Sequence, residues 1–206
     1  TTTIPVEVIY AAGCVPVDLN NLFITSPDPH AMVEDAERAG YPRNICAWIK
    51  GIYGAALAHP EIKTVIAVTQ GDCSNTHALM ETLQLAGLRI IPFAYPFDRD
   101  RDLLRMQIEK LMAAFGVSWP EVMDAKRQLD RVRRLVWRID ELTWRENKVG
   151  GWDNHYYQVC CSDFNGNPEA FYDEVKDFLA VAEAKKPRTD DIRLGYIGVP
   201  PIVNDI

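Results

Sequence analysis

The sequence lacks the features that would place the protein on nucleic acid or in a membrane. Lys and Arg number 22 against 29 Asp and Glu, so the formal net charge is −7. A chain with this balance has no excess of basic residues with which to bind nucleic acid. No apolar run reaches the roughly 18 residues that a membrane-spanning helix needs, and no signal peptide opens the chain. We therefore expect a cytoplasmic protein that binds neither nucleic acid nor a membrane.

Two nucleotide-binding motifs are also missing. There is no G-x-x-x-x-G-K-S/T phosphate loop and no G-x-G-x-x-G fingerprint, so any ATP that the activity uses must be bound by another protein. The five cysteines include no C-x-x-C pair, which argues against zinc-ribbon and thioredoxin-type sites. Their odd number and the adjacent pair Cys160 and Cys161 do not suit a disulfide framework.

The composition is typical of a globular protein. Of 206 residues, 48% are hydrophobic and 25% are charged, which is enough for one well-packed α/β domain with a helical addition. The chain opens at Thr1 without an initiator methionine, and residues 193–201 read as a new strand and turn. We therefore expect it to be the first part of a longer protein.

The first half of the sequence predicts a β-α-β unit. Residues 63–69 form an uninterrupted β-branched run, a helix follows over 76–86, and a second strand follows over 89–95. Strand, helix and strand of these lengths predict a parallel sheet flanked by helices, with ligands at the carboxyl ends of the strands. Before this unit we expect helices over 5–13, 30–39 and 45–58 (the last capped by Asn44), an extended run over 14–19 and a loop over 20–29.

The second half predicts a helical annex. Apolar residues recur at helical spacing over 102–115 and 120–146, and a last helix is expected over 169–184. The predicted fold is α/β, with a flavodoxin-like or Rossmann-like lobe over 1–100, a helical annex over 101–190, and the start of a second, similar α/β lobe over 191–206.

Three cysteines lie at the edges of predicted elements. Cys14 follows a helix end, Cys46 opens a helix, and Cys73 follows a strand directly. Free N–H groups at a helix N-terminus favour a thiolate, and thiolates are the ligands of iron–sulfur clusters, which need not be close in sequence. An iron–sulfur site is one interpretation of this pattern. Burial of the cysteines as ordinary core residues is the other.

The remaining polar residues allow weaker interpretations. The segment 71–75 could be a nucleophile turn with His77 as its base, although an ordinary polar role for His77 in a first helical turn is favoured. Asp72 and Asn75 are candidate caps of the following helix. Cys160 and Cys161 are expected to fill space, because two adjacent side chains rarely face one metal.

Several segments together resemble a known family. Residues 3–17 contain a Pro-x-Glu helix that runs into Ala-Ala-Gly and then Pro-Val, which resembles the opening motif of the 2-hydroxyacyl-CoA dehydratase and benzoyl-CoA reductase family. Residues 46–54 and 71–75 resemble its second and third cysteine segments, although Ser74 stands where the family more often has Asp. Residues 151–171 and 193–201 resemble the end of its first half and the first strand of its second half.

The resemblance implies two similar α/β domains with a helical portion between them and an iron–sulfur cluster, either 4Fe–4S or a double-cubane 8Fe–9S cluster. It implies Cys46 and Cys73 as cluster ligands. Cys14 is a further candidate, because many members carry a cysteine just before the Pro-x-Glu segment, where Thr1 to Thr3 stand here. A partner ATPase with its own iron–sulfur cluster would supply low-potential electrons under anaerobic conditions. These would drive dehydration of a 2-hydroxyacyl-CoA, a lyase reaction, or reduction of an aromatic acyl-CoA, in a homodimer or a heterodimer.

Three other functions stay open at this point. One is a double-cubane reductase of small molecules that are not CoA esters. Another is a non-catalytic cluster-binding subunit that passes on electrons or acts as a scaffold. The third is a cofactor-free α/β binding domain whose cysteines are structural.

Overall fold

The computed structural model describes residues 4–190 and 192–195. It divides into two compact units, Thr1–Glu121 and Val122–Ile206, and each is described by itself. The domain limits expected near residues 100 and 190 stay predictions.

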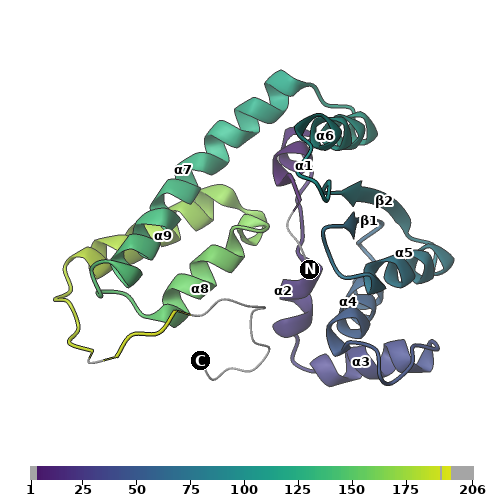
Figure 1. Cartoon of the computed structure of the whole chain (residues 1–206), viewed down its shortest axis with the longest axis horizontal. Coiled ribbons are helices and arrows are strands. Elements are labelled where there is room, and N and C mark those ends of the chain that lie inside the picture. Colours follow the sequence, from purple (N-terminus) through teal and green to yellow (C-terminus); the bar gives the residue numbers. More distant parts are fainter. Residues whose placement is uncertain (1–3, 191, 196–206) are drawn as a thin grey trace. The chain divides into compact units, whose positions relative to one another are not determined.

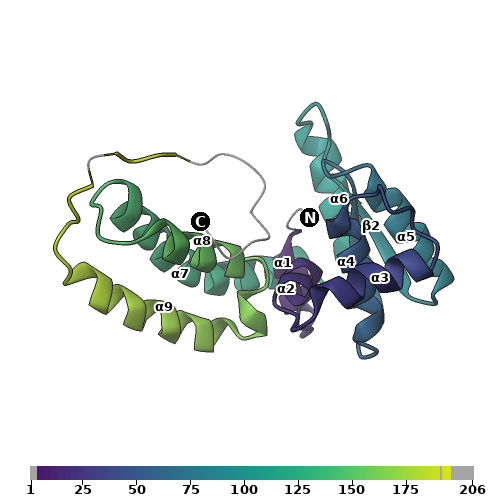
Figure 2. The same ribbon diagram turned by 90° about the horizontal axis from the view of Figure 1, so that it is seen from below.

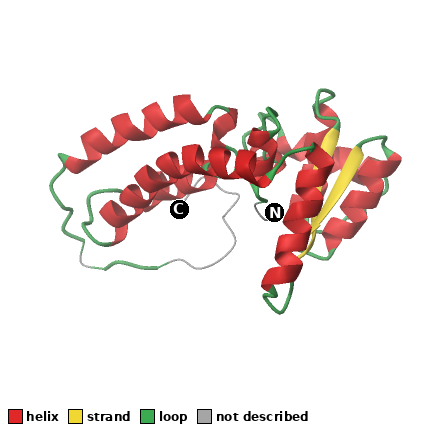
Figure 3. Cartoon of the chain, turned by 90° about the horizontal axis from the view of Figure 1, so that it is seen from above, coloured by secondary structure: helices red, strands yellow, loops and turns green. Residues whose placement is uncertain are grey.

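The first unit holds the parallel strand pair and most of the shorter helices. Its elements in chain order are α1 (Val6–Ala11), α2 (Leu19–Ile24), α3 (Pro29–Arg38), α4 (Ala47–Ala58), β1 (Thr64–Gln70), α5 (Asn75–Leu85), β2 (Arg89–Ala94) and α6 (Arg101–Phe115) (Figure 1). β1 pairs with β2 in parallel, from Thr64 opposite Arg89 to Val68 opposite Phe93. Helices lie on both sides of the two strands (Figures 2 and 3). The predicted α/β class is therefore confirmed.

The core of this unit forms where α4 meets β1 and α5. Buried side chains from these elements make one cluster with neighbours from α3, and it includes Ile49, Ile52, Tyr53, Val65, Leu79 and Leu83. Two glycines bring further helices close to α4. A Cβ atom on Gly51 would overlap the Phe23 ring of α2, and one on Gly54 would overlap the Met32 carbonyl oxygen of α3. The small residues of α4 thus allow two helices to pack directly against its backbone.

The local expectations for α2 and for the start of α4 are wrong. The segment expected to be a loop over 20–29 begins with α2, whose N-cap Asp18 accepts a hydrogen bond from the backbone N–H of Asn20. The N-cap of α4 is Cys46 and not Asn44, so Cys46 precedes the first turn of the helix and does not lie in it. The other expected helices and both strands are present within one or two residues of their predicted limits.

The second unit is helical. It contains most of α7 (Trp119–Trp144), then α8 (Gly151–Cys160), the short 3₁₀ turn η1 (Phe164–Gly166) and α9 (Pro168–Glu183). The buried residues of α7 recur at helical spacing: Val122, Leu129, Val132, Val136, Ile139 and Leu142. The sequence did not predict α8. The strand expected over 193–201 lies largely outside the described residues.

Candidate functional site

Cys46 stands at the entrance of α4. It is exposed and free, and its side chain makes no capping hydrogen bond to the helix. Its carbonyl oxygen accepts the first helical bond, from the N–H of Lys50 at 3.3 Å. Because the N–H groups of a helix's first turn lack helical partners, negative charge on a group at this end is favoured.

The loop before Cys46 is tied down by a buried lysine. Lys50 is only 3% exposed. Its ammonium group donates to Glu37 Oε1 of α3 at 2.6 Å and to the Arg43 carbonyl oxygen at 3.1 Å. The hydrogen bond from Lys50 is the main reason why the pKa of Glu37 is lowered. A buried ammonium needs such partners, because leaving it unpaired is costly.

Cys73 lies in the loop between β1 and α5, at the carboxyl end of β1, and its thiol is exposed and free. Two features shape this loop. Gly71 has φ +90°, and a Cβ atom there would lie 2.9 Å from Cβ of Tyr95. Asp72 Oδ1 accepts from the backbone N–H of Cys73 at 2.6 Å. The N-cap of α5 is Ser74, without a side-chain capping bond, so the expected capping by Asp72 or Asn75 is wrong.

His77 of α5 contacts the strand that precedes the same loop. Its Nε2 lies 2.8 Å from the Thr69 carbonyl oxygen of β1. A carbonyl can only accept, so Nε2 carries the proton in this bond. The described interaction of the imidazole is therefore with the strand end, and it supports a structural role for His77 over that of a base for Cys73.

Cys14 is placed differently. It follows the turn after α1 in which Gly13 has φ +68°, and its exposed thiol lies 3.8 Å from the Ala12 carbonyl oxygen. Within the described residues, no three His, Cys, Asp or Glu side chains gather so as to hold a metal ion. Cys14, Cys46 and Cys73 therefore share one unit and similar exposure, but they do not form a closed ligand set in this structure.

Cys160 and Cys161, at the end of α8, are less exposed than the three cysteines of the first unit. Cys160 is buried, and burial raises the pKa of its thiol to about 11. Burial likewise raises the pKa of Cys161 to about 12. Both side chains are therefore neutral thiols at neutral pH, which suits space-filling and disfavours metal ligation.

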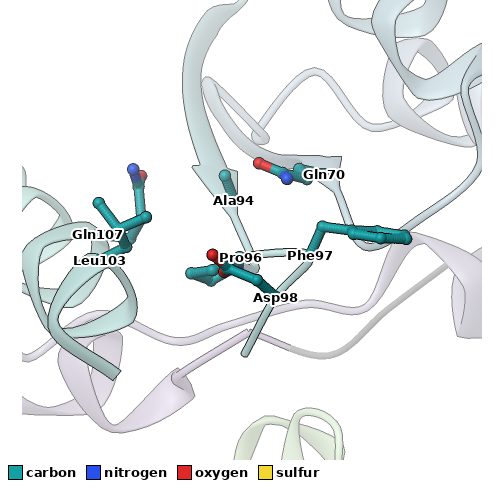
Figure 4. A pocket seen from close by; sticks show the side chains of 7 residues that line it. All are labelled: Gln70, Ala94, Pro96, Phe97, Asp98, Leu103 and Gln107. Carbon is teal, nitrogen blue, oxygen red and sulfur yellow. The ribbon is translucent and has the colours of Figure 1, made fainter. Parts of the chain in front are cut away.

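A pocket of about 290 Å³ opens beside the ends of β1 and β2 (Figure 4). Gln70 ends β1, Ala94 ends β2, and Leu103 and Gln107 come from α6. The residues that line it are Gln70, Ala94, Pro96, Phe97, Asp98, Leu103 and Gln107. Ligands of parallel sheets bind at this end of the strands, so the pocket is a candidate ligand site.

Fold and site define an α/β protein that exposes free thiols where its secondary-structure elements meet loops. Over residues 1–206, the chain matches the family model described as 2-hydroxyglutaryl-CoA dehydratase, D-component. The chain belongs to this family, and the resemblance seen in the sequence is confirmed. Searches of curated proteins and of solved structures found no match. In the described part of the chain, no helix has the length and apolarity to cross a membrane.

Sequence reasoning missed the contacts that hold the cysteine loops. Lys50 could have been noticed, because it is the one charged residue in the otherwise small and apolar stretch of α4, Ala47–Ala58. Such a residue is usually paired when buried. Nothing in the sequence pointed to Thr69 as the partner of His77.

Proposed function

We propose that the chain is the cluster-binding part of a 2-hydroxyacyl-CoA dehydratase-like enzyme. Cys46 and Cys73 are two thiolate ligands of an iron–sulfur cluster, and Cys14 is a third candidate. A partner ATPase with its own iron–sulfur cluster supplies the electrons, and the substrate is an acyl-CoA. When bound, the cluster supplies low-potential electron transfer to the substrate.

The exposure of the cysteines is the observation that carries this proposal. Cysteine is among the residue types most often buried, yet Cys14, Cys46 and Cys73 are all exposed and free. Of the two remaining cysteines, which belong to the other unit, Cys160 is buried and Cys161 is half-buried. Thiolates are the ligands of 4Fe–4S clusters, so the donor chemistry fits, while the ligand set needs at least one further donor.

The chain's own residues have defined tasks in this proposal. The N-terminus of α4 favours negative charge on Cys46, and the loop between β1 and α5 presents Cys73 at the strand end. Together they hold two thiolates on the first unit. Donors from another surface would then complete the coordination and exclude water.

Iron analysis of cysteine variants tests the ligand assignment. Protein purified without oxygen and reconstituted with iron and sulfide should be brown. Cys46→Ser and Cys73→Ser should each lose most of the bound iron, and Cys14→Ser shows whether the third thiol participates. Cys160→Ser is the matched control and should keep its iron, because that thiol is buried.

Two results would contradict the proposal. A wild-type chain that takes up no iron under these conditions rejects the cluster altogether. Equal iron content in the Cys46, Cys73 and Cys160 variants rejects the assignment of Cys46 and Cys73 as ligands.

A second candidate is a reductase of small molecules that are not CoA esters. The pocket beside β1 and β2, with a volume of about 290 Å³, can hold a small ligand. With the partner ATPase present, turnover of a 2-hydroxyacyl-CoA supports the dehydratase. Turnover of azide without any CoA ester supports the reductase.

A further inference from the structure

The two loops that carry Cys46 and Cys73 are built in the same way. In each, the residue four positions after the cysteine reaches back and donates a hydrogen bond to a backbone carbonyl before it. Lys50 donates to the Arg43 carbonyl, three residues before Cys46. His77 donates to the Thr69 carbonyl, four residues before Cys73. Each bond closes its loop around the cysteine.

These closures join separate elements. Lys50 belongs to α4, and its ammonium group also bonds to Glu37 of α3 at 2.6 Å, so the loop before Cys46 is tied to two helices. His77 belongs to α5 and donates to the carbonyl of Thr69, the last residue but one of β1, so the loop around Cys73 is tied to the sheet. Cys14 lies in the turn after α1, where its backbone N–H donates to the Ile9 carbonyl at 3.1 Å and its thiol lies near the Ala12 carbonyl.

We propose that Lys50 and His77 are positioning residues that hold Cys46 and Cys73, respectively, in place as cluster ligands. Cluster binding itself rests on the proposed function. The support that the two hydrogen bonds give the loops, here called bracing, can be measured without a cluster. A ligand held by its own loop loses less conformational entropy when it binds, so each of the two hydrogen bonds favours its cysteine as a ligand.

Hydrogen exchange in the iron-free, full-length chain tests the bracing. Loss of one hydrogen bond should speed local opening by about fivefold, the effect of a typical net hydrogen-bond energy. Lys50→Met should therefore speed exchange over residues 43–46 and leave 71–74 unchanged. His77→Leu should do the reverse. His77→Gln should stay close to wild type, because its amide nitrogen can donate to the same carbonyl.

Controls separate positioning from general loss of stability. Lys63→Met removes an exposed lysine of the same unit, and His30→Leu removes an exposed histidine; both should exchange like wild type over the two loops. Because Lys50 is buried, Glu37→Gln is measured as well: it leaves the lysine in place and weakens its ion pair. If Lys50→Met does not fold, Glu37→Gln and the His77 variants decide the question.

Iron release connects the bracing to the cluster. In iron-loaded protein, Lys50→Met and His77→Leu should each release iron to a chelator about fivefold faster than wild type, and His77→Gln should not. Equal acceleration of exchange in both loops, or none, overturns the proposal, as does unchanged iron release in variants whose loops open faster. A wild-type chain without iron uptake rejects the proposed function, while the exchange pattern still decides the bracing.

Discussion

Gly71 is the residue whose backbone most directly shapes the Cys73 loop. Its φ of +90° is strained for any residue with a side chain, and a Cβ atom would lie 2.9 Å from Cβ of Tyr95. We expect Gly71→Ala to lower the free energy of unfolding by about 1–3 kcal/mol. It should also speed hydrogen exchange over residues 71–74. Urea denaturation of the full chain measures the first effect and mass spectrometry the second.

Gly87 provides a matched control for this change. Its φ of +91° is nearly the same, but nothing lies within 4 Å of a Cβ atom there. Gly87→Ala should therefore cost only the backbone strain, about 1 kcal/mol. If the two variants lose equal stability, the close approach to Tyr95 does not constrain the loop.

Among the elements, α7 and α9 of the second unit are joined by one arginine. Arg138 donates from Nε to Glu183 Oε1 at 2.7 Å and from Nη2 to Glu183 Oε2 at 3.0 Å. It also donates to Glu146 at 2.6 Å. These hydrogen bonds from Arg138 are the main reason that the pKa values of Glu183 and Glu146 are lowered. A fork that bonds to both oxygens of one carboxylate holds the two helices in register.

The lowered pKa values fix the pH dependence of this link. Each carboxylate stabilises the fold fully above its unfolded pKa, about 4.3, and loses that contribution as pH falls through the lowered folded value. Arg138→Met should reduce the free energy of unfolding by about 1 kcal/mol at pH 7, and the difference from wild type should shrink towards zero below pH 3. Urea denaturation across pH measures this. Arg134→Met, which removes an exposed arginine of the same helix, is the control, and a pH-independent difference would contradict the assignment.

The helices show where a sequence pattern is enough to predict secondary structure and where it is not. α6 and α7 were predicted because their apolar residues recur at helical spacing over several turns. α2 was missed because its short sequence, Leu19–Ile24, contains two asparagines, which favour turns. It is helical in a place where Phe23 packs on Gly51 of α4, and such a tertiary contact overrides weak local propensity. α8 was missed because it begins at Gly151, directly after Gly150, and glycine is a poor helix former.

For the whole molecule, the order of short motifs identified the family, and the α/β class followed from one strand–helix–strand pattern. The candidate site could be predicted from the sequence only in part. That Cys73 follows a strand and that Cys46 lies near the start of a helix could be read from the sequence. The bonds from Lys50 and His77 to backbone carbonyls could not, because they depend on how neighbouring elements fold back around each loop. The ligand roles of Cys14, Cys46 and Cys73 stay predictions.

The number of cysteines leads to a last prediction, for the whole molecule. The sequence has five, but Cys160 is buried and Cys161 half-buried, and burial raises the pKa of both thiols. Three exposed thiols remain, one fewer than the four ligands of an all-cysteine 4Fe–4S site. Iron loading should therefore be coupled to association, with a second copy or another protein supplying a ligand. Anaerobic size-exclusion chromatography with light scattering and iron analysis, without added small thiols, should find the iron in a species larger than the 23.3 kDa chain. About four irons per chain in a monomer would contradict it.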